Sequence, residues 1–122
     1  MGNDKAPVKA PFKMTPAVFH VLLAMADGEI HGYRIMQEVE ARSRGSVKLG
    51  PGSLYFTINR LTDSGMIEES DQRPDPKLDD SRRKYYRLTQ YGRAVLQSEL
   101  TTLADIVAVA RSKDLISDSK SA

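Results

Sequence analysis

Apolar residues recur at intervals of three and four along four stretches of the chain, the spacing expected for one face of an α-helix. Two of these stretches follow a threonine that can cap a helix, Thr15 and Thr89. A glycine follows the C-terminal end of each of the first three stretches: Gly28, Gly45 and Gly65. The pattern therefore predicts helices over about 16–26 and 31–43, a third that opens within 50–53 and ends at 63, and a fourth over 90–112.

Two short segments between the last two helices are interpreted as β-strands. Met66–Ser70 is the first, and Arg83–Leu88 is the second, with Tyr86 and Leu88 on one side at the two-residue period of a strand. A polar connection with two prolines, 71–82, separates them, so we expect a hairpin. Ser46–Leu49 also fits one short extended strand.

The order of these elements predicts the fold. Three helices followed by a small β-hairpin are typical of a winged helix-turn-helix domain, a mainly α fold (α+β) that we place at residues 15–89. The long helix 90–112 follows as a dimerisation helix. The proline- and lysine-rich residues 1–14 are expected to form a flexible basic arm, and 113–122 a flexible tail.

Composition and charge add weak constraints. The chain has 122 residues, enough for one domain, and a formal net charge of +2, which permits a polyanionic partner without requiring one. It has no cysteine, which excludes disulfides and agrees with a cytoplasmic location. No apolar run is long enough to span a membrane, so no membrane partner is expected.

The sequence predicts neither an enzyme nor a cofactor or metal site. Its two histidines, His20 and His31, fall on different predicted elements, and no nucleophile–base pair is legible. His20 lies inside an apolar helix and is interpreted as a packed residue. The acidic residues Asp75, Asp79 and Asp80 lack the spacing and central glycine of a calcium loop, which favours a solvated loop.

Several motifs, in order, resemble the PadR family of phenolic-acid-responsive repressors, and in particular its smaller subfamily with a single helix after the wing. The resemblance covers about residues 17–112 and implies a winged helix-turn-helix repressor that binds double-stranded DNA as a dimer. The motifs are His31-Gly32-Tyr33, Gly50-Pro51-Gly52-Ser53-Leu54-Tyr55, Arg60-Leu61, Gly65-Met66-Ile67, Arg83-Lys84-Tyr85-Tyr86-Arg87-Leu88-Thr89 and Gly92-Arg93.

The third helix is the candidate recognition helix. With Leu54, Ile58 and Leu61 facing the core, the outward half carries residues suited to a major groove: an amide for adenine, a guanidinium for guanine or phosphate, and an aromatic ring for a thymine methyl. The resemblance implies a backbone contact for the tyrosine. A solvated face, with Arg60 in an ion pair to Asp63 or to the second helix, is the alternative. The candidate DNA-binding residues are Ser53, Tyr55, Phe56, Asn59 and Arg60.

Basic residues at the start of the second strand are candidates for phosphate contacts beside the groove. These are Arg82, Arg83 and Lys84. The connection 71–82 carries more acidic than basic side chains, so we expect the base of the wing, and not its tip, to bind DNA. Lys5, Lys9 and Lys13 could follow a groove, although a solubilising role is the simpler interpretation.

The last helix carries an apolar seam with alternating steps of four and three residues, as in a coiled coil. Its residues are Leu96, Leu100, Leu103, Val107 and Ala110. A helix of about 34 Å is too long to pack wholly on so small a domain, which favours a homodimer over packing within one chain. A two-fold dimer would bind a pseudopalindromic operator.

Two further alternatives remain open. Some members of the resembled family bind planar aromatic effectors, and Phe12, Phe19, Met25 and Met36 are candidates to line such a pocket, although core packing is the more common role of these residue types. A winged helix that binds another protein, and not specific DNA, would have the same fold.

Overall fold

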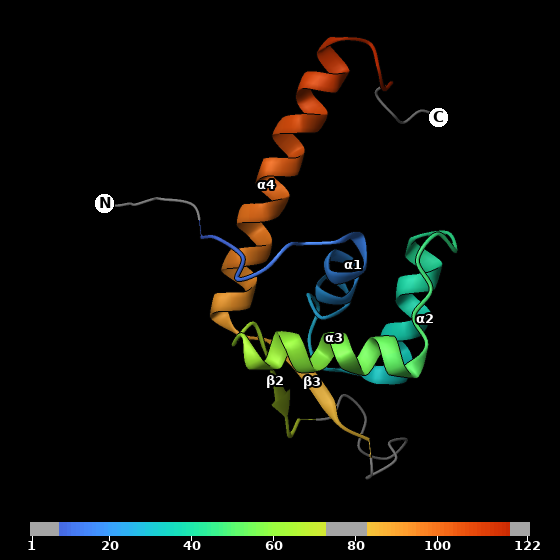
Figure 1. The fold of residues 1–122 in the computed structure, drawn as a ribbon, viewed down its shortest axis with the longest axis vertical. Helices are drawn as coiled ribbons and strands as arrows, with labels where there is room; N and C mark the ends of the chain where they lie inside the picture. Colours follow the sequence, from blue (N-terminus) through green and yellow to red (C-terminus); the bar gives the residue numbers. More distant parts are fainter. Residues whose placement is uncertain (1–7, 73–82, 118–122) are drawn as a thin grey trace.

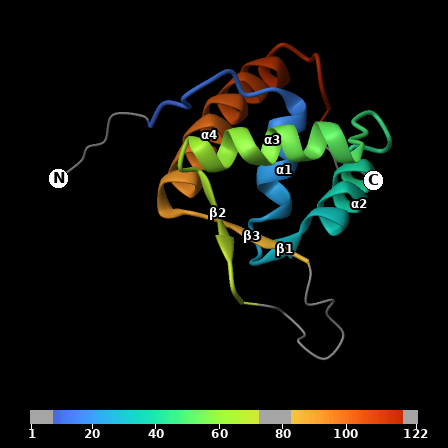
Figure 2. The same cartoon turned by 60° about the horizontal axis from the view of Figure 1, so that its bottom comes forward.

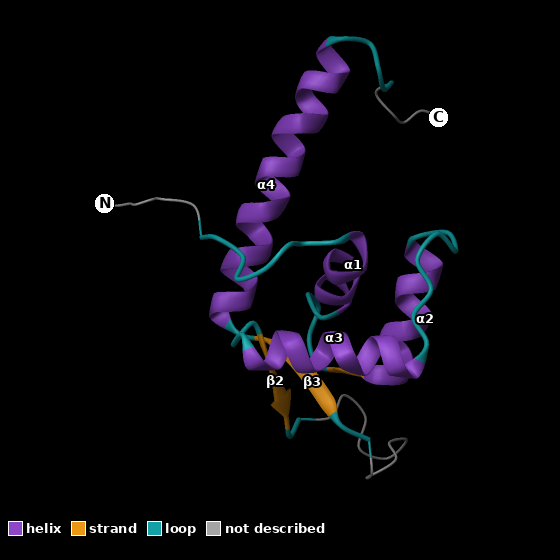
Figure 3. Cartoon of the chain, viewed as in Figure 1, coloured by secondary structure: helices purple, strands orange, loops and turns teal. Residues whose placement is uncertain are grey.

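A computed structural model describes residues 8–72 and 83–117 of the chain. It contains the four predicted helices and both strands of the predicted hairpin, which confirms the fold class (Figures 1 and 3). In chain order the elements are α1 (Pro16–Ala24), β1 (Ile30–His31), α2 (Gly32–Arg42), α3 (Pro51–Asp63), β2 (Ile67–Ser70), β3 (Tyr85–Leu88) and α4 (Gln90–Ser112).

The sheet has a strand that the sequence pattern did not predict. β1 pairs antiparallel with β3, which lies between β1 and β2, and Ile30 is opposite Tyr86. The expected strand at Ser46–Leu49 does not form. Its backbone folds back on the end of α2 instead, where the Ser43 hydroxyl accepts from the amide of Val47 (3.0 Å) and donates to its carbonyl oxygen (3.2 Å).

The core lies where α1, α2 and α3 meet the sheet and the first turns of α4 (Figure 2). α1 contributes Val21 and Leu22, and α3 contributes one stripe of Leu54, Ile58 and Leu61, all fully or almost fully buried. This stripe is the one that the helical period predicts. It fixes which side of α3 faces away from the domain.

Helix α4 extends well beyond this core (Figure 1). Val95 and Leu96 are buried within the domain, and Leu100 packs at its edge. Beyond Leu100 nearly every residue of α4 is exposed, and large apolar side chains are among them. The outer half of the helix thus presents apolar surface that its own domain leaves uncovered.

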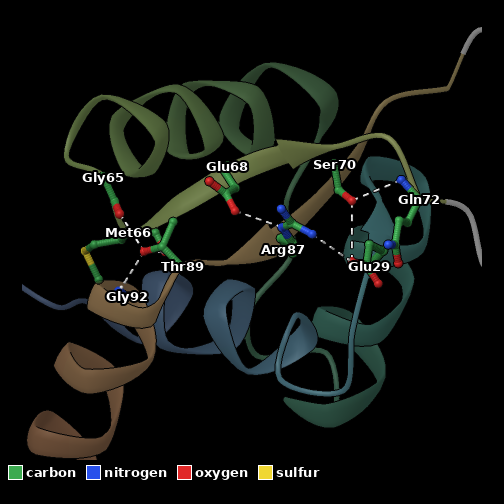
Figure 4. A network of polar contacts seen from close by, with 9 residues as sticks. All are labelled: Glu29, Gly65, Met66, Glu68, Ser70, Gln72, Arg87, Thr89 and Gly92. Carbon is green, nitrogen blue, oxygen red and sulfur yellow. Dashed lines mark hydrogen bonds and ion pairs between the residues drawn. The ribbon is translucent and has the colours of Figure 1, made fainter.

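The start of α4 is fastened to the turn that ends α3 (Figure 4). The Thr89 hydroxyl accepts from the amide of Gly92 (2.9 Å) and donates to the carbonyl oxygens of Gly65 (2.6 Å) and Met66 (3.1 Å). The Thr89 amide also donates to the Met66 carbonyl (3.1 Å). One residue therefore caps α4 and holds it against the α3–β2 turn.

Replacing Thr89 with valine, which keeps the branched shape but removes the hydroxyl, is expected to destabilise the protein. The change leaves an amide and two carbonyls without this partner, which should lower the free energy of unfolding by about 1–2 kcal/mol. Chemical denaturation monitored by circular dichroism measures this. Thr89→Ser keeps the hydroxyl and should stay within about 0.5 kcal/mol of the parent; equal losses for both variants would contradict the role given to the hydroxyl.

At Gly92 the backbones of α4 and the α3–β2 turn approach so closely that no side chain fits between them. A Cβ atom built there would meet the Met66 carbonyl oxygen, and would lie 2.7 Å from its carbonyl carbon and 3.0 Å from its Cα. Both are backbone atoms of Met66, so neither can rotate out of the way. Position 92 therefore requires glycine for steric reasons.

Residues 8–14 differ from the flexible arm that composition predicts. Val8, Ala10, Phe12 and Met14 are partly buried against the core, and the segment runs beside α4 before it enters α1 (Figures 1 and 2). Apolar side chains at every second position give this extended segment one face that can pack. Lys9 and Lys13 alternate with them and are exposed.

Candidate nucleic-acid interface

The exposed side of α3 carries the four side chains that the helical period placed on its outward half, together with Tyr55 from the border of that face. Ser53, Tyr55, Phe56, Asn59 and Arg60 are all exposed. Phe56 keeps 64% of its surface accessible, which is unusual for a phenylalanine on an otherwise polar face. The helix begins at Pro51 after Gly50, within the predicted range, and Gly50 cannot offer a side-chain cap to the first amides.

Tyr55 is positioned by a glycine on the neighbouring helix. A Cβ atom at Gly32 would meet the Tyr55 hydroxyl oxygen and would lie 3.0 Å from the ring carbon that bears it. Gly32 thereby lets the tyrosine lie across the first turn of α2. Tyr55 thus lies against α2 through the end of its ring and still remains 43% accessible.

An open groove of about 720 Å³ lies between α3, the start of α2 and the base of the wing, formed by β2 and β3. It brings together four of the predicted DNA-binding residues: Tyr55 and Asn59 from α3, and Arg83 and Lys84 from the residues before β3. Two cations, an amide and a phenolic hydroxyl on one concave surface suit a polyanionic strand. His31, Gly32, Tyr33 and Tyr86 complete the lining.

The α2 side of this groove was not predicted. His31 caps α2, since its Nδ1 accepts from the amide of Arg34 (3.2 Å), and its Nε2 lies 3.2 Å from a guanidinium nitrogen of Arg83. The ring also meets Tyr85 edge-on at 5.3 Å. The His31-Gly32-Tyr33 motif was the available signal, but nothing in the sequence shows that it faces the wing.

Arg87, in contrast, is neutralised within the sheet (Figure 4). Its Nε donates to Glu68 (2.8 Å), and a second nitrogen lies 3.6 Å from Glu29. The hydrogen bond to Glu68 raises the pKa of Arg87 above its ordinary value. The Glu29 carboxylate also accepts from the Ser70 hydroxyl (3.4 Å). This cation of β3 thus belongs to the sheet and not to the groove.

At the floor of the groove, burial raises the pKa of Tyr86, and the nearby Tyr55 and Glu69 add to the effect. A tyrosine with the ordinary pKa of about 10 is protonated at neutral pH with or without this shift, so Tyr86 adds a neutral side chain to the lining of the groove.

The surroundings of Arg60 differ from the ion pair that the sequence analysis considered. Its guanidinium carbon lies 4.1 Å from the centre of the Phe12 ring and 6.0 Å from that of Phe56. Within residues 8–72 and 83–117, no ion pair joins Arg60 to Asp63 or to α2. The positive charge of Arg60 therefore lies next to aromatic rings and remains at the surface.

Comparison with known protein families identifies the family to which this chain belongs. Residues 21–98 match the transcriptional regulator PadR-like family. A curated relative, transcriptional regulator Rv3488 of Mycobacterium tuberculosis, is 35% identical over 95 residues, which cover 78% of this chain and 82% of the relative. The chain belongs to the PadR-like family. It is a DNA-binding transcriptional regulator and not an enzyme.

Solved structures agree with the fold of this PadR-like protein. A PadR family transcription regulator from Clostridium difficile R20291 superposes with a TM-score of 0.59 at 23% identity, over 77% of this chain and 95% of that one. A transcriptional regulator from Clostridium thermocellum gives 0.62 at 20% identity, over 79% and 87% of the two chains. At these identities the likeness concerns the fold.

The predicted seam of this PadR-like protein divides into two parts. Leu96 is only 4% exposed and is taken up by the domain's own core, and Leu100 packs at the core's edge. Leu103 and Val107 remain exposed, and Ile106 beside them is 59% exposed. Ala110 extends the same stripe by one turn.

Some predicted residues fall elsewhere. Met25 is buried and Met36 packs against the core, whereas Phe12 and Phe19 lie beside hollows next to α4. His20 is partly buried, and its Nδ1 finds no hydrogen-bond partner among the described residues. Arg82, Lys5 and the acidic residues Asp75, Asp79 and Asp80 lie outside the described residues. No helix within the described ranges is long and apolar enough to cross a bilayer.

Proposed function

We propose that this PadR-like protein is a sequence-specific repressor that binds a pseudopalindromic operator as a homodimer. The observation that carries this proposal is the groove in which Tyr55 and Asn59 of α3 face Arg83 and Lys84 at the base of the wing. A recognition helix reads base edges, whereas cations flanking it bind phosphates and fix the register. One short groove combines both kinds of side chain.

Each chemical group has a role in this proposal. Asn59 pairs with an adenine edge, and Phe56 lies against a thymine methyl group. Arg60 binds guanine or phosphate. Ser53, Tyr55, Arg83, Lys84 and the undescribed Arg82 bind the sugar–phosphate backbone. Two copies of α3 would enter successive major grooves, about one helical turn apart.

The same proposal includes two partners besides DNA. A second copy of the chain covers the apolar stripe of Leu103, Val107 and Ala110, continued from Leu100. A small aromatic effector would enter the apolar hollow of about 430 Å³ between α1 and α4, next to Phe19 and Leu103. The mostly apolar lining of this hollow suits a planar and mostly apolar molecule.

The Lys84→Ala variant tests the DNA-binding groove. Loss of one phosphate contact per protomer should weaken binding to a duplex that the parent protein selects from a random pool by about five- to tenfold. It should also reduce the slope of log affinity against log salt by about one per protomer. Gel-shift titrations at several salt concentrations measure both quantities.

Arg87→Ala is the matched control, because it removes the same charge from the same part of the chain but from a side chain already paired with Glu68 and Glu29. Its salt slope should equal that of the parent. If Lys84→Ala and Arg87→Ala have the same slope, Lys84 does not bind phosphate. If the parent selects no duplex, a protein-binding module becomes the better interpretation.

A further inference from the structure

The side chains of Phe12 and Arg60 are in contact although they belong to distant segments of the chain. The proposed binding of α3 to DNA does not account for this contact. Phe12 precedes α1, whereas Arg60 lies in the last turns of α3. The guanidinium carbon of Arg60 is 4.1 Å from the Phe12 ring centre, well inside the range of a cation–π contact. Phe56, at 6.0 Å, lies at the limit of that range. Phe12 is therefore the main aromatic partner of Arg60.

The cation–π contact with Phe12 does not supply an acceptor for the N–H donors of Arg60. A guanidinium placed over a ring uses its flat face, while its N–H donors point outward in the plane. No acidic side chain among the described residues takes up these donors. An arginine restrained in this way loses less side-chain entropy when it binds a phosphate or a guanine.

Phe12 can restrain Arg60 because its own segment is anchored. Val8, Ala10 and Met14 pack against the core on the same side of the segment. Phe12 and Met14 also border a hollow whose other wall includes Phe19 of α1 and Leu103 of α4. The Phe12 ring thus belongs to a segment that packs against the core, near α1 and α4.

We propose that Phe12 is a positioning residue for Arg60, and that residues 8–14 thereby support the DNA interface of α3 without contacting DNA themselves. The ring holds the guanidinium at the C-terminal end of α3 with its donors directed to DNA. The inference rests on the proposed function, because it requires Arg60 to bind the duplex. It assigns to Phe12 a role in affinity without any contact with DNA of its own.

A double-mutant cycle between Phe12 and Arg60 tests this proposal on the full chain. The probe is a duplex selected from a random pool by the parent protein, and the readouts are duplex affinity by gel shift and thermal stability. Phe12→Leu keeps an apolar anchor but removes the ring face, and should weaken binding about three- to tenfold. Phe12→Tyr keeps the ring face and should bind within about twofold of the parent.

In the Arg60→Ala background, Phe12→Leu should cause no further loss, since the group that it positions is gone. Equal losses in both backgrounds would show that Phe12 acts only on the fold and would overturn the inference. So would an unchanged affinity of Phe12→Leu for a duplex that the parent binds. If Phe12→Leu does not fold, Phe12→Met replaces it in the same cycle. A parent protein that selects no duplex overturns the proposed function, and the inference with it.

Discussion

Replacing Gly92 with alanine is expected to lower the free energy of unfolding by about 3 kcal/mol or more. Alanine is ordinarily the better helix former by about 1 kcal/mol, so propensity alone predicts the opposite sign. Sterics decide the outcome, because the new methyl group would overlap the Met66 carbonyl, with its carbon at 2.7 Å. Met66 is itself held by two hydrogen bonds from Thr89, so relief would require α4 to move as a whole.

Thermal and urea denaturation of Gly92→Ala measure this loss. Gly52→Ala is the matched control, since it makes the same change inside a helix where a Cβ meets nothing within 4 Å. It should leave stability unchanged or raise it by up to about 1 kcal/mol. If the two variants are equally stable, the close approach of α4 to the α3–β2 turn does not exist in solution.

The second large effect is expected for Val107→Asp. This substitution should convert a homodimer into folded monomers. Val107 is 39% exposed in the single chain and lies beyond the residues that complete the core, so the domain should keep its stability. A two-fold seam would bring two copies of the new carboxylate together in an apolar contact. Desolvation and repulsion should weaken dimerisation at least about a hundredfold. Binding to a two-half-site duplex should fall with it.

Sedimentation equilibrium or light scattering after size exclusion measures the mass of each variant. Thr101→Asp is the control, because it adds the same charge to α4 on the side away from the seam at nearly equal helix propensity. It should remain dimeric. A parent protein that is monomeric at micromolar concentration, or a Val107→Asp variant that stays dimeric, would contradict the seam.

The helices were predictable because their limits depend on local chemistry. α4 spans Gln90–Ser112 as the pattern indicated, since Thr89 caps its start and the amide of Gly92 completes the cap. Thr15 acts in the same way on α1, where its hydroxyl accepts from Val18. A cap and its partner lie three residues apart, so the sequence contains both members of the interaction.

The third strand was not predictable in the same way. β1 has two residues, and His31 in it also caps α2. Its strand geometry depends on pairing with Tyr85 and Tyr86, more than fifty positions later in the chain. Ser46–Leu49 had a similar local pattern but finds no strand to pair with. Residues 8–14 were misjudged because proline and lysine content hid the apolar face that packs.

In the candidate site, too, the features set by local sequence were predictable and the contacts between distant segments were not. A helical wheel correctly separated the exposed Asn59 and Arg60 from the buried Ile58. It could not show which elements face them: the start of α2 across the groove from Asn59, and Phe12 against Arg60. Such contacts join distant parts of the chain, so only the folded domain reveals them.

The hydrogen bonds of Thr89 have a consequence for the operator spacing of the proposed homodimer. Because Thr89 hydrogen-bonds the start of α4 to the turn that ends α3, a tilt of α4 that keeps these bonds turns α3 by the same angle. A tilt of about 5° moves the far end of a helix about 34 Å long by roughly 3 Å, close to the rise of one base-pair step. Small changes in how two long helices cross would therefore shift the protein's register on DNA by about a base pair.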